Sequence, residues 1–182
     1  MNMPVKLLFS LTVGLLGTFS LAKAQETSRF AIASPAFTAG GTIPPAYTCK
    51  NSKAGSPQLT WQGTPKDARS LALIVEDPDA PNGTFIHWVV YNISVNITRL
   101  DASVAPTEQL GGGGMQGANT LGKIGYMGPC PPPGSSPHHY HFKLMALDAT
   151  LDLKPGASAQ QVEAASRGHV KAEADLVGTF AR

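Results

Sequence analysis

Two uninterrupted runs of apolar residues limit the possible folds of this chain more than any other feature. Residues 70–76 read SLALIVE and residues 87–93 read HWVVYNI, so apolar side chains occupy consecutive positions rather than every second one. Successive side chains of a strand point to opposite faces, so these runs predict central strands of a sheet that is covered on both faces.

Shorter β-type runs, separated by glycine and proline, fill most of the remaining chain. Further strands are predicted at residues 30–32, at residues 59–61 and across residues 139–148. Many short strands with turn residues between them are typical of a β-sandwich. The sequence therefore predicts a mainly β fold.

Helix is predicted only near the C-terminus. Ser158 is suited to be the N-cap of a helix over residues 159–168, and Gly168 would end or kink that helix. Residues 169–177 (HVKAEADLV) are predicted to continue as a second helical piece with a modest apolar stripe. We expect these short C-terminal helices to pack against the sandwich.

The N-terminus has the pattern of a secretory signal peptide. Lys6 precedes an apolar stretch over residues 7–21, and Ala22-Lys23-Ala24 provides a small-x-small cleavage site. A membrane anchor is the alternative, but the stretch is short for a span of roughly 20 apolar residues. We expect a signal peptide over residues 1–24, a single domain over residues 25–182 without a later membrane span, and a periplasmic or secreted location.

Charge gives no indication of a nucleic-acid partner. The chain has 14 Lys and Arg residues, of which Lys6 and Lys23 leave with the signal, and the 12 that remain equal the 12 acidic residues. A neutral mature chain without a stripe of basic residues argues against nucleic-acid binding. The four glycines at residues 111–114 lack the Gly-Lys-Ser/Thr signature of a phosphate loop, so they predict a surface loop, and no cofactor is expected.

The chain has two cysteines, Cys49 and Cys130. In an exported protein one disulfide between them is the economical prediction, and two buried thiols are the alternative. A catalytic cysteine is disfavoured because Cys130 lies between Pro129 and Pro131, with no helix N-terminus to lower its pKa.

Residues 126–142 (YMGPCPPPGSSPHHYHF) combine a stiff proline segment with three histidines. In a strand that follows Pro137, one face carries His138, Tyr140 and Phe142, and the other carries His139, His141 and Lys143. This alternation divides the histidines between two faces and disfavours a metal site built from all three. An imidazole and a phenol that share a face at positions i and i+2 can instead donate hydrogen bonds to one point.

A second segment, residues 76–93 (EDPDAPNGTFIHWVVYNI), brings carboxylates close to an imidazole. Pro78 and Pro81 end the preceding strand, which leaves Asp77 and Asp79 at its end. His87 begins the next strand and could meet an aspartate there, which would raise the pKa of its imidazole. Two acids without further oxygen ligands make a weak calcium site.

The motifs in these two segments together resemble the phosphatidylethanolamine-binding protein family, and most closely its bacterial Raf-kinase-inhibitor-like branch. The motifs are Asp77-Pro-Asp-Ala-Pro81, His87-Trp88, Gly128-Pro-Cys-Pro-Pro-Pro-Gly134 and His138-x-Tyr140. The resemblance extends over nearly all of the mature chain and implies a compact antiparallel β-sandwich with a C-terminal helix. It also implies a small pocket that binds phosphate-like anions.

Transfer of the family's pocket, residue by residue, selects six positions: Asp77, Pro81, His87, Gly128, His138 and Tyr140. Asp79 is a further candidate, either to secure the loop or to meet the ammonium group of a ligand such as phosphoethanolamine. The chain departs from the family at His139, where an arginine is usual. Alternation turns this position away from the pocket, but an ion pair that supports the loop could be lost.

Three functions follow from these residues. The first is an exported binding protein for a phosphate-like anion or a phospholipid head group, in which Asp77 keeps His87 charged while His87, His138 and Tyr140 donate to phosphoryl oxygens. The second is an inhibitor or modulator of a protein partner, such as a protease or kinase, recognised through the proline loop. Hydrolysis by the His and Asp residues is the weakest, because no Gly-x-Ser-x-Gly elbow or activated nucleophile is found, and we expect no enzyme.

Overall fold

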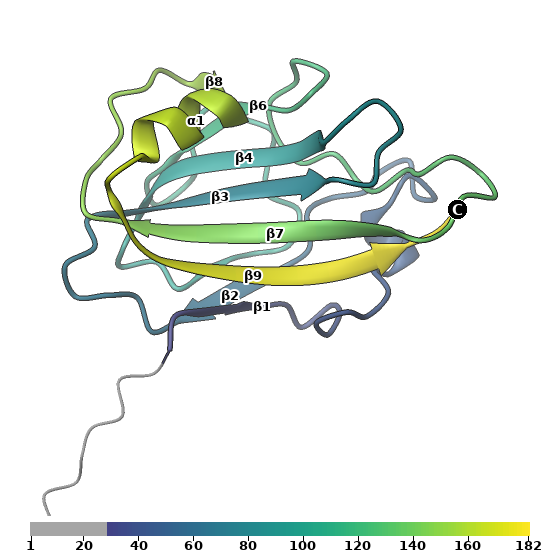
Figure 1. Ribbon diagram of the computed structural model, residues 1–182, viewed down its shortest axis with the longest axis horizontal. Coiled ribbons are helices and arrows are strands. Elements are labelled where there is room, and N and C mark those ends of the chain that lie inside the picture. The colour runs from purple at the N-terminus through teal and green to yellow at the C-terminus, as the bar shows by residue number, and fades with distance from the viewer. Residues whose placement is uncertain (1–28) are drawn as a thin grey trace, which may run out of the picture.

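The structure is a computed structural model that describes residues 29–182 as two packed β-sheets (Figure 1). The smaller sheet has the order β1-β2-β5, with β1 at Ala31–Ala33, β2 at Leu59–Gln62 and β5 at Arg99–Leu100. The larger sheet has the order β8-β6-β4-β3-β7-β9, and its strands are β3 (Ser70–Asp77), β4 (Phe85–Ser94), β6 (Met115–Ala118), β7 (His138–Leu147), β8 (Gly156–Ser158) and β9 (Val170–Phe180). These strands pair antiparallel, apart from the parallel pair β6 and β8. The predicted β-sandwich is confirmed.

The larger sheet is buried on both of its faces, as its two apolar runs predict. Between the sheets lies a core that includes Trp88, Phe142 and Leu73. A second core, with Ile74 and Tyr91, lies on the opposite face of the same sheet. Each CH₂ group removed from water contributes about 0.8 kcal/mol, so two cores on one sheet are the main stabilisation of this fold.

The second core is covered by one short helix, α1 (Ala159–Ser166), which lies beside β4 in Figure 1. Its predicted start is confirmed: the Ser158 hydroxyl accepts from the Gln161 N–H, and the Gln161 side chain accepts from the Ser158 N–H. The helix ends near Gly168, whose φ of 80° suits glycine. A 3₁₀ turn, η1, covers Pro45–Tyr47.

The second predicted C-terminal helix is wrong, because residues 170–180 form the long strand β9 along β7. The sequence there alternates with a period of two: Lys171, Glu173 and Asp175 are exposed. The small and apolar residues between them are at least half-buried. Helical spacing of the apolar residues is present as well, but pairing with β7 satisfies the backbone and decides the structure.

A disulfide joins Cys49 to Cys130, with the two Cα atoms 5.3 Å apart, so the predicted bridge is present. Among residues 29–182, no helix is both long and apolar enough to span a membrane. The predicted signal peptide, residues 1–24, lies outside the described part of the chain.

The sheet order brings the candidate residues to one end of the sandwich. In the antiparallel order β4-β3-β7, the last residue of β3 lies beside the first residues of β4 and β7. Asp77 ends β3, His87 is the third residue of β4 and His138 begins β7. Residues far apart in the sequence therefore meet where these three strands end or begin.

Candidate functional site

The centre of the candidate site is a buried pair of Asp77 and His138. Oδ2 of Asp77 lies 2.8 Å from Nδ1 of His138, and the side chains are 5% and 8% exposed. A carboxylate can only accept, so His138 donates from Nδ1. Oδ1 of Asp77 accepts from the Asp79 N–H at 2.9 Å, which fixes the loop that follows β3.

His87 lies in the same cluster, but its partner differs from the expected one. Its Nδ1 donates to the Met127 carbonyl at 2.7 Å, and the Met127 N–H donates to the His87 carbonyl at 2.9 Å. Burial is the largest influence on this imidazole and lowers its pKa, outweighing the Met127 carbonyl and the charge of Asp77. The structure thus differs from the prediction that Asp77 holds His87: Asp77 pairs with His138, and burial lowers the pKa of His87 more than the charge of Asp77 raises it.

Tyr140 lies between the two imidazoles. Its ring centroid is 5.2 Å from that of His87, nearly perpendicular to it, and 6.5 Å from that of His138, nearly parallel. Within residues 29–182 its hydroxyl is a buried polar atom without a hydrogen-bond partner. Burial is the largest cause that raises the pKa of this phenol, followed by the negative charge of Asp77 and by a side-chain contact with Asp77 that falls outside hydrogen-bond geometry. The phenol therefore stays protonated and can donate.

A hollow of about 470 Å³ opens beside this cluster. Three predicted residues, Asp79, Pro81 and His138, line it, whereas Asp77, His87 and Tyr140 are buried and do not line it. Its other lining residues are Pro132, Ser135, Ser136, Pro137 and His139. Sequence analysis missed the two serines, although their place between the prolines and His138 was a signal that could have revealed them.

His139, where the family usually has arginine, pairs with Asp79. Oδ2 of Asp79 accepts from the His139 backbone N–H at 2.8 Å and from its Nδ1 at 2.7 Å. The His139 side chain is the largest cause that lowers the pKa of the Asp79 carboxyl, followed by the His139 backbone. His139 thus makes a contact with the loop after β3, which the replacement of the usual arginine had put in doubt. His139 is exposed whereas His138 and Tyr140 are buried, as strand alternation predicts.

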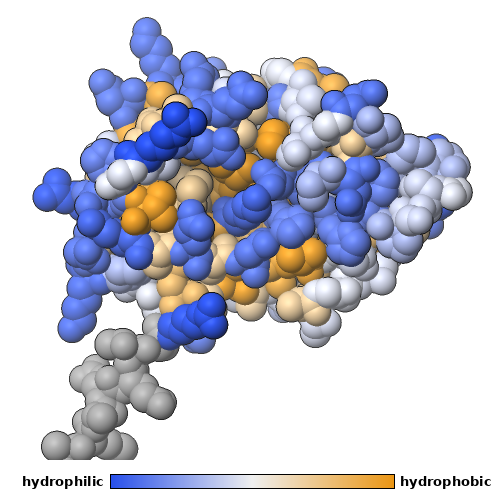
Figure 2. Space-filling model, viewed as in Figure 1, coloured by the Kyte–Doolittle hydropathy of each residue, from blue (hydrophilic) through white to orange (hydrophobic). Residues whose placement is uncertain are grey.

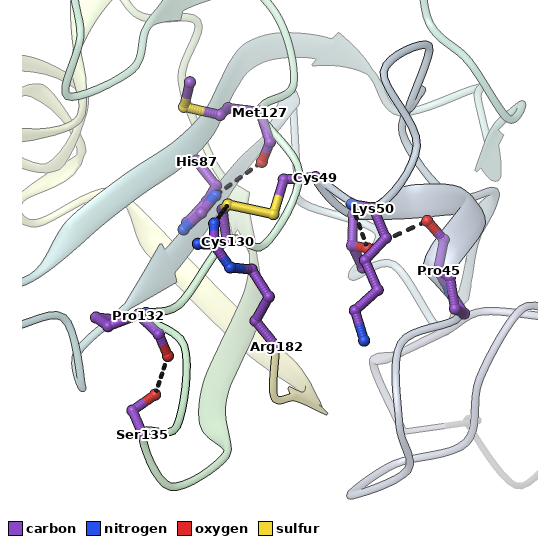
Figure 3. Close-up of a disulfide and its surroundings, with 10 residues drawn as sticks. Pro45, Cys49, Lys50, His87, Met127, Cys130, Pro132, Ser135 and Arg182 are labelled. Carbon is purple, nitrogen blue, oxygen red and sulfur yellow. Dashed lines mark hydrogen bonds between the residues drawn. A yellow bond between two sulfur atoms is a disulfide. The ribbon is translucent and has the colours of Figure 1, made fainter.

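The wall of the hollow is anchored by the disulfide (Figure 3). The Cys49 N–H donates to the Pro129 carbonyl at 3.0 Å, and Nη1 of Arg182 lies 3.3 Å from Sγ of Cys130. A Cβ on Gly128 would stand 2.7 Å from the Tyr47 carbonyl oxygen, closer than side chains allow. Gly128 therefore serves close backbone packing beneath the wall, and any contact of Gly128 with a ligand stays a prediction.

The other face of β7 carries a row of ion pairs. His141 Nδ1 lies 2.7 Å from Asp175 Oδ2, and Lys143 pairs with Glu76. These pairs link β9 and β3 to β7. The His141–Asp175 pair is partly exposed, and surface pairs contribute up to about 1 kcal/mol. Within the described residues, no group of three or more His, Cys, Asp or Glu side chains is placed to hold a metal.

Comparison with known proteins agrees with this fold. Residues 33–181 match the family model described as "Phosphatidylethanolamine-binding protein". A UPF0098 protein of Methanothermobacter thermautotrophicus is 48% identical over 147 residues, which cover 81% of this chain and 95% of the relative.

Solved structures show the same architecture. A phosphatidylethanolamine-binding protein homologue from Chlamydia trachomatis is 39% identical, with a TM-score of 0.76, over 85% of this chain and 98% of the other. E. coli YbcL, described as a member of the mammalian PEBP family, is 30% identical, with a TM-score of 0.77, over 85% and 99% of the two chains.

Proposed function

Because this chain belongs to the phosphatidylethanolamine-binding protein family, we propose that it binds phosphate-like anions, free or as phospholipid head groups, at the hollow beside His138. The observation that carries the proposal is the buried Tyr140 hydroxyl, which has no partner among residues 29–182. Leaving a buried polar group without a hydrogen bond costs about 1–3 kcal/mol. A ligand oxygen that reaches this hydroxyl would remove that cost.

The two imidazoles suit a phosphoryl group in a definite protonation state. Nδ1 of His87 and Nδ1 of His138 are both occupied, by the Met127 carbonyl and by Asp77. Each ring therefore has its Nε2 left for a ligand, as an acceptor when the ring is neutral and as a donor when it is charged. A singly protonated phosphate offers both an O–H and anionic oxygens, so it can satisfy either form.

The lining of the hollow contains no Lys or Arg, so binding depends on the histidines for positive charge. Burial lowers the pKa of His87, so this ring gains its proton only below the ordinary value of 6.5. Anion binding should therefore strengthen as pH falls and weaken as pH rises through the histidine range.

Calorimetric titration with inorganic phosphate and with phosphoethanolamine tests the proposal. We expect binding near pH 5.5 that weakens at least about tenfold by pH 8 and is lost in His138→Ala. His141→Ala is the matched control, because this residue is on the opposite face of β7 and should leave affinity unchanged. Equal affinity at the two pH values, or full affinity in His138→Ala, would overturn it. Tighter binding of phosphoethanolamine would identify the head group and implicate Asp79 in holding its ammonium.

We infer that the protein acts outside the cytoplasm. Its disulfide joins two exposed cysteines, and such bridges persist in oxidising compartments. A relative that is 41% identical over 149 residues, LppC of Mycobacterium tuberculosis, is named as a candidate lipoprotein. Intact-mass measurement of protein from the native host tests this inference: export with cleavage predicts a mature chain that begins at Gln25 and has lost two hydrogens to the bridge.

A protein partner is a second candidate, supported by the exposed proline loop. Pro132, Pro133 and Pro137 are exposed at the rim of the hollow, on a stiff segment that loses little entropy when it is bound. Capture from periplasmic extract by both wild type and His138→Ala would favour a partner that does not need the anion site. Capture by neither would exclude this candidate.

A further inference from the structure

The edge strand β9 is covered along one half and open along the other. In its second half, the Val177 carbonyl accepts from the Gly40 N–H at 2.7 Å, and Thr179 exchanges hydrogen bonds with Gly41 and Ile43. Among residues 29–182, no segment other than β7 forms backbone hydrogen bonds with residues 170–175. This first half is a free sheet edge, and free edges are templates for pairing with another strand.

The backbone groups on this open edge can be assigned from the covered half. The backbone N–H and C=O groups of Val177 and Thr179 point away from β7. Because these groups alternate in direction along a strand, those of Asp175 and Glu173 also point away from β7. Lys171 has no partner on β7, because the register shifts between Ala146 and Leu147. Three successive odd-numbered positions thus offer backbone groups to an incoming strand.

The charges along this edge change sign halfway. Exposed side chains run from Lys171 through Glu173 to Asp175, a basic residue followed by two acidic residues. Between them, Ala172 and Ala174 are half-buried, and Val170 at the start of the strand is 37% exposed. A strand with basic and acidic halves matches a copy of itself that runs in the opposite direction.

We propose that β9 pairs antiparallel with β9 of a second copy of this chain, about a two-fold axis at Ala172. In this register Lys171 of each copy stands opposite Glu173 of the other, and Val170 stands opposite Ala174. The odd-numbered backbone groups that face the open edge are then the ones that exchange hydrogen bonds. Two six-stranded sheets become one continuous sheet across the dimer.

Neighbouring registers are less favourable. An axis at Glu173 would pair Lys171 with Asp175 but would place this glutamate opposite its own copy at the centre of the interface. An axis at Ala174 would place Glu173 opposite Asp175. Like charges directly opposite each other are destabilising. The intrachain partners of the edge do not prevent the pairing, because the contacts of Lys171 with Asp148 and of Asp175 with His141 are exposed ion pairs that exchange readily.

The surface beside this edge also suits a second copy. A hollow of about 830 Å³ borders β9. Its wall combines apolar residues such as Phe30 and Ile32 with residues of α1 and with the charged side chains of Lys143, Glu173 and Asp175. Figure 2 shows apolar residues on this side of the molecule, set among hydrophilic ones. Pairing of β9 would cover Val170 and narrow this hollow. The interface is short, so we expect a dimer that dissociates on dilution.

Reversal of charge at two positions tests the register. Sedimentation velocity from about 1 µM to about 1 mM should show a concentration-dependent dimer. Lys171→Glu and Glu173→Lys should each weaken dimerisation by about tenfold or more, because each creates two like-charge pairs. The double variant should restore dimerisation, because the two positions again carry opposite charges, now exchanged. Lys53→Glu, on an exposed loop, is the matched control and should dimerise like wild type.

Amide exchange gives a second readout that does not depend on any substitution. The Lys171 and Glu173 amides, which pair with each other across the two-fold axis, should exchange more slowly as concentration rises, whereas the Thr179 amide, already bonded to Gly41, should not respond. If the protein stayed monomeric over the whole concentration range, the proposal would be overturned. Binding of an unrelated extended peptide to this edge would not rescue it. Failure of the double variant to recover dimerisation would overturn the register.

Discussion

Asp77 and His138 form a hydrogen-bonded pair at 2.8 Å although 61 residues separate them in the sequence and both side chains are nearly inaccessible to water. Each side chain is the hydrogen-bond partner of the other, so removing either one leaves a buried polar group without a partner. The pair therefore fixes the end of β3 to the start of β7 and orients the ring that lines the hollow.

Asp77→Asn should destabilise the fold by about 1–3 kcal/mol, because an amide cannot replace both the charge and the two hydrogen bonds that the carboxylate accepts. Urea unfolding at pH 7 measures this change. The control is Asp101→Asn, whose contact with Arg99 is exposed and should contribute less than about 1 kcal/mol. Equal, small effects of the two substitutions would show that the buried pair has no special role.

Removal of the Tyr140 hydroxyl should affect stability and binding in opposite directions. Tyr140→Phe deletes a buried polar group that has no partner in the described structure, so unfolding in phosphate-free buffer should be unchanged or require more urea. Addition of phosphate should then stabilise the variant less than the wild type.

Tyr126→Phe is the matched control for this experiment. The Tyr126 hydroxyl donates to the Tyr47 carbonyl at 3.1 Å, so its deletion should cost about 1 kcal/mol and leave the phosphate response intact. A Tyr140→Phe variant that is destabilised as much as Tyr126→Phe, with or without phosphate, would show that the Tyr140 hydroxyl has a structural partner.

The pKa of the Asp79 carboxyl should depend on which residue occupies position 139. Its folded-state pKa is lowered, chiefly by the His139 side chain, so its contribution to stability is present above the ordinary value of 3.8 and is lost as pH falls through the lower folded value. NMR titration of the Asp79 side chain should show a higher pKa in His139→Ala, though still below 3.8 because the backbone N–H remains.

Arginine at position 139 should keep that pKa low, since a guanidinium can also donate to the carboxylate. His141→Ala should leave the titration of Asp79 unchanged, because His141 pairs with Asp175 instead. An unchanged pKa in His139→Ala would assign the shift to the backbone alone.

Sequence reasoning succeeded where one local rule decides the structure. A period of two assigns His138 and Tyr140 to one face of β7 and His139 to the other, and no tertiary information is needed for that. The same period was present in Lys171, Glu173 and Asp175 of β9, but those alanine-rich residues also fit a helix. Pairing with β7 decided between the two, and the sequence does not contain that pairing.

Local sequence patterns could not predict which histidine pairs with Asp77, for a related reason. His87 and His138 both lie near the start of a strand that adjoins β3, so the sequence allows either imidazole to meet the carboxylate. The outcome depends on the main chain of Met127, which comes from a loop and occupies Nδ1 of His87. A loop carbonyl has no sequence signature, because every residue has one.

Loss of the disulfide should weaken the fold and loosen the wall of the hollow. The bridge joins residues that are 81 positions apart, and closing a loop of this length stabilises by roughly 2–4 kcal/mol. Cys49→Ser with Cys130→Ser should therefore unfold at lower urea concentration, and dithiothreitol should bring the wild type to the same midpoint. As the internal control, dithiothreitol should not change the midpoint of the double variant. If dithiothreitol also left the midpoint of the wild type unchanged, this would show that no bridge forms.

Gly128 allows a test of whether this position serves packing or ligand contact. In Gly128→Ala the new Cβ would stand 2.7 Å from the Tyr47 carbonyl oxygen and 3.0 Å from Thr48 Cα, both backbone atoms that cannot move alone. Overpacking of this kind costs about 1–3 kcal/mol. Gly111→Ala is the control, because no atom lies within 4 Å of its added Cβ, and it should be nearly neutral. Gly128→Ala protein that keeps wild-type stability but loses phosphate affinity would contradict the packing role and place this backbone against the ligand.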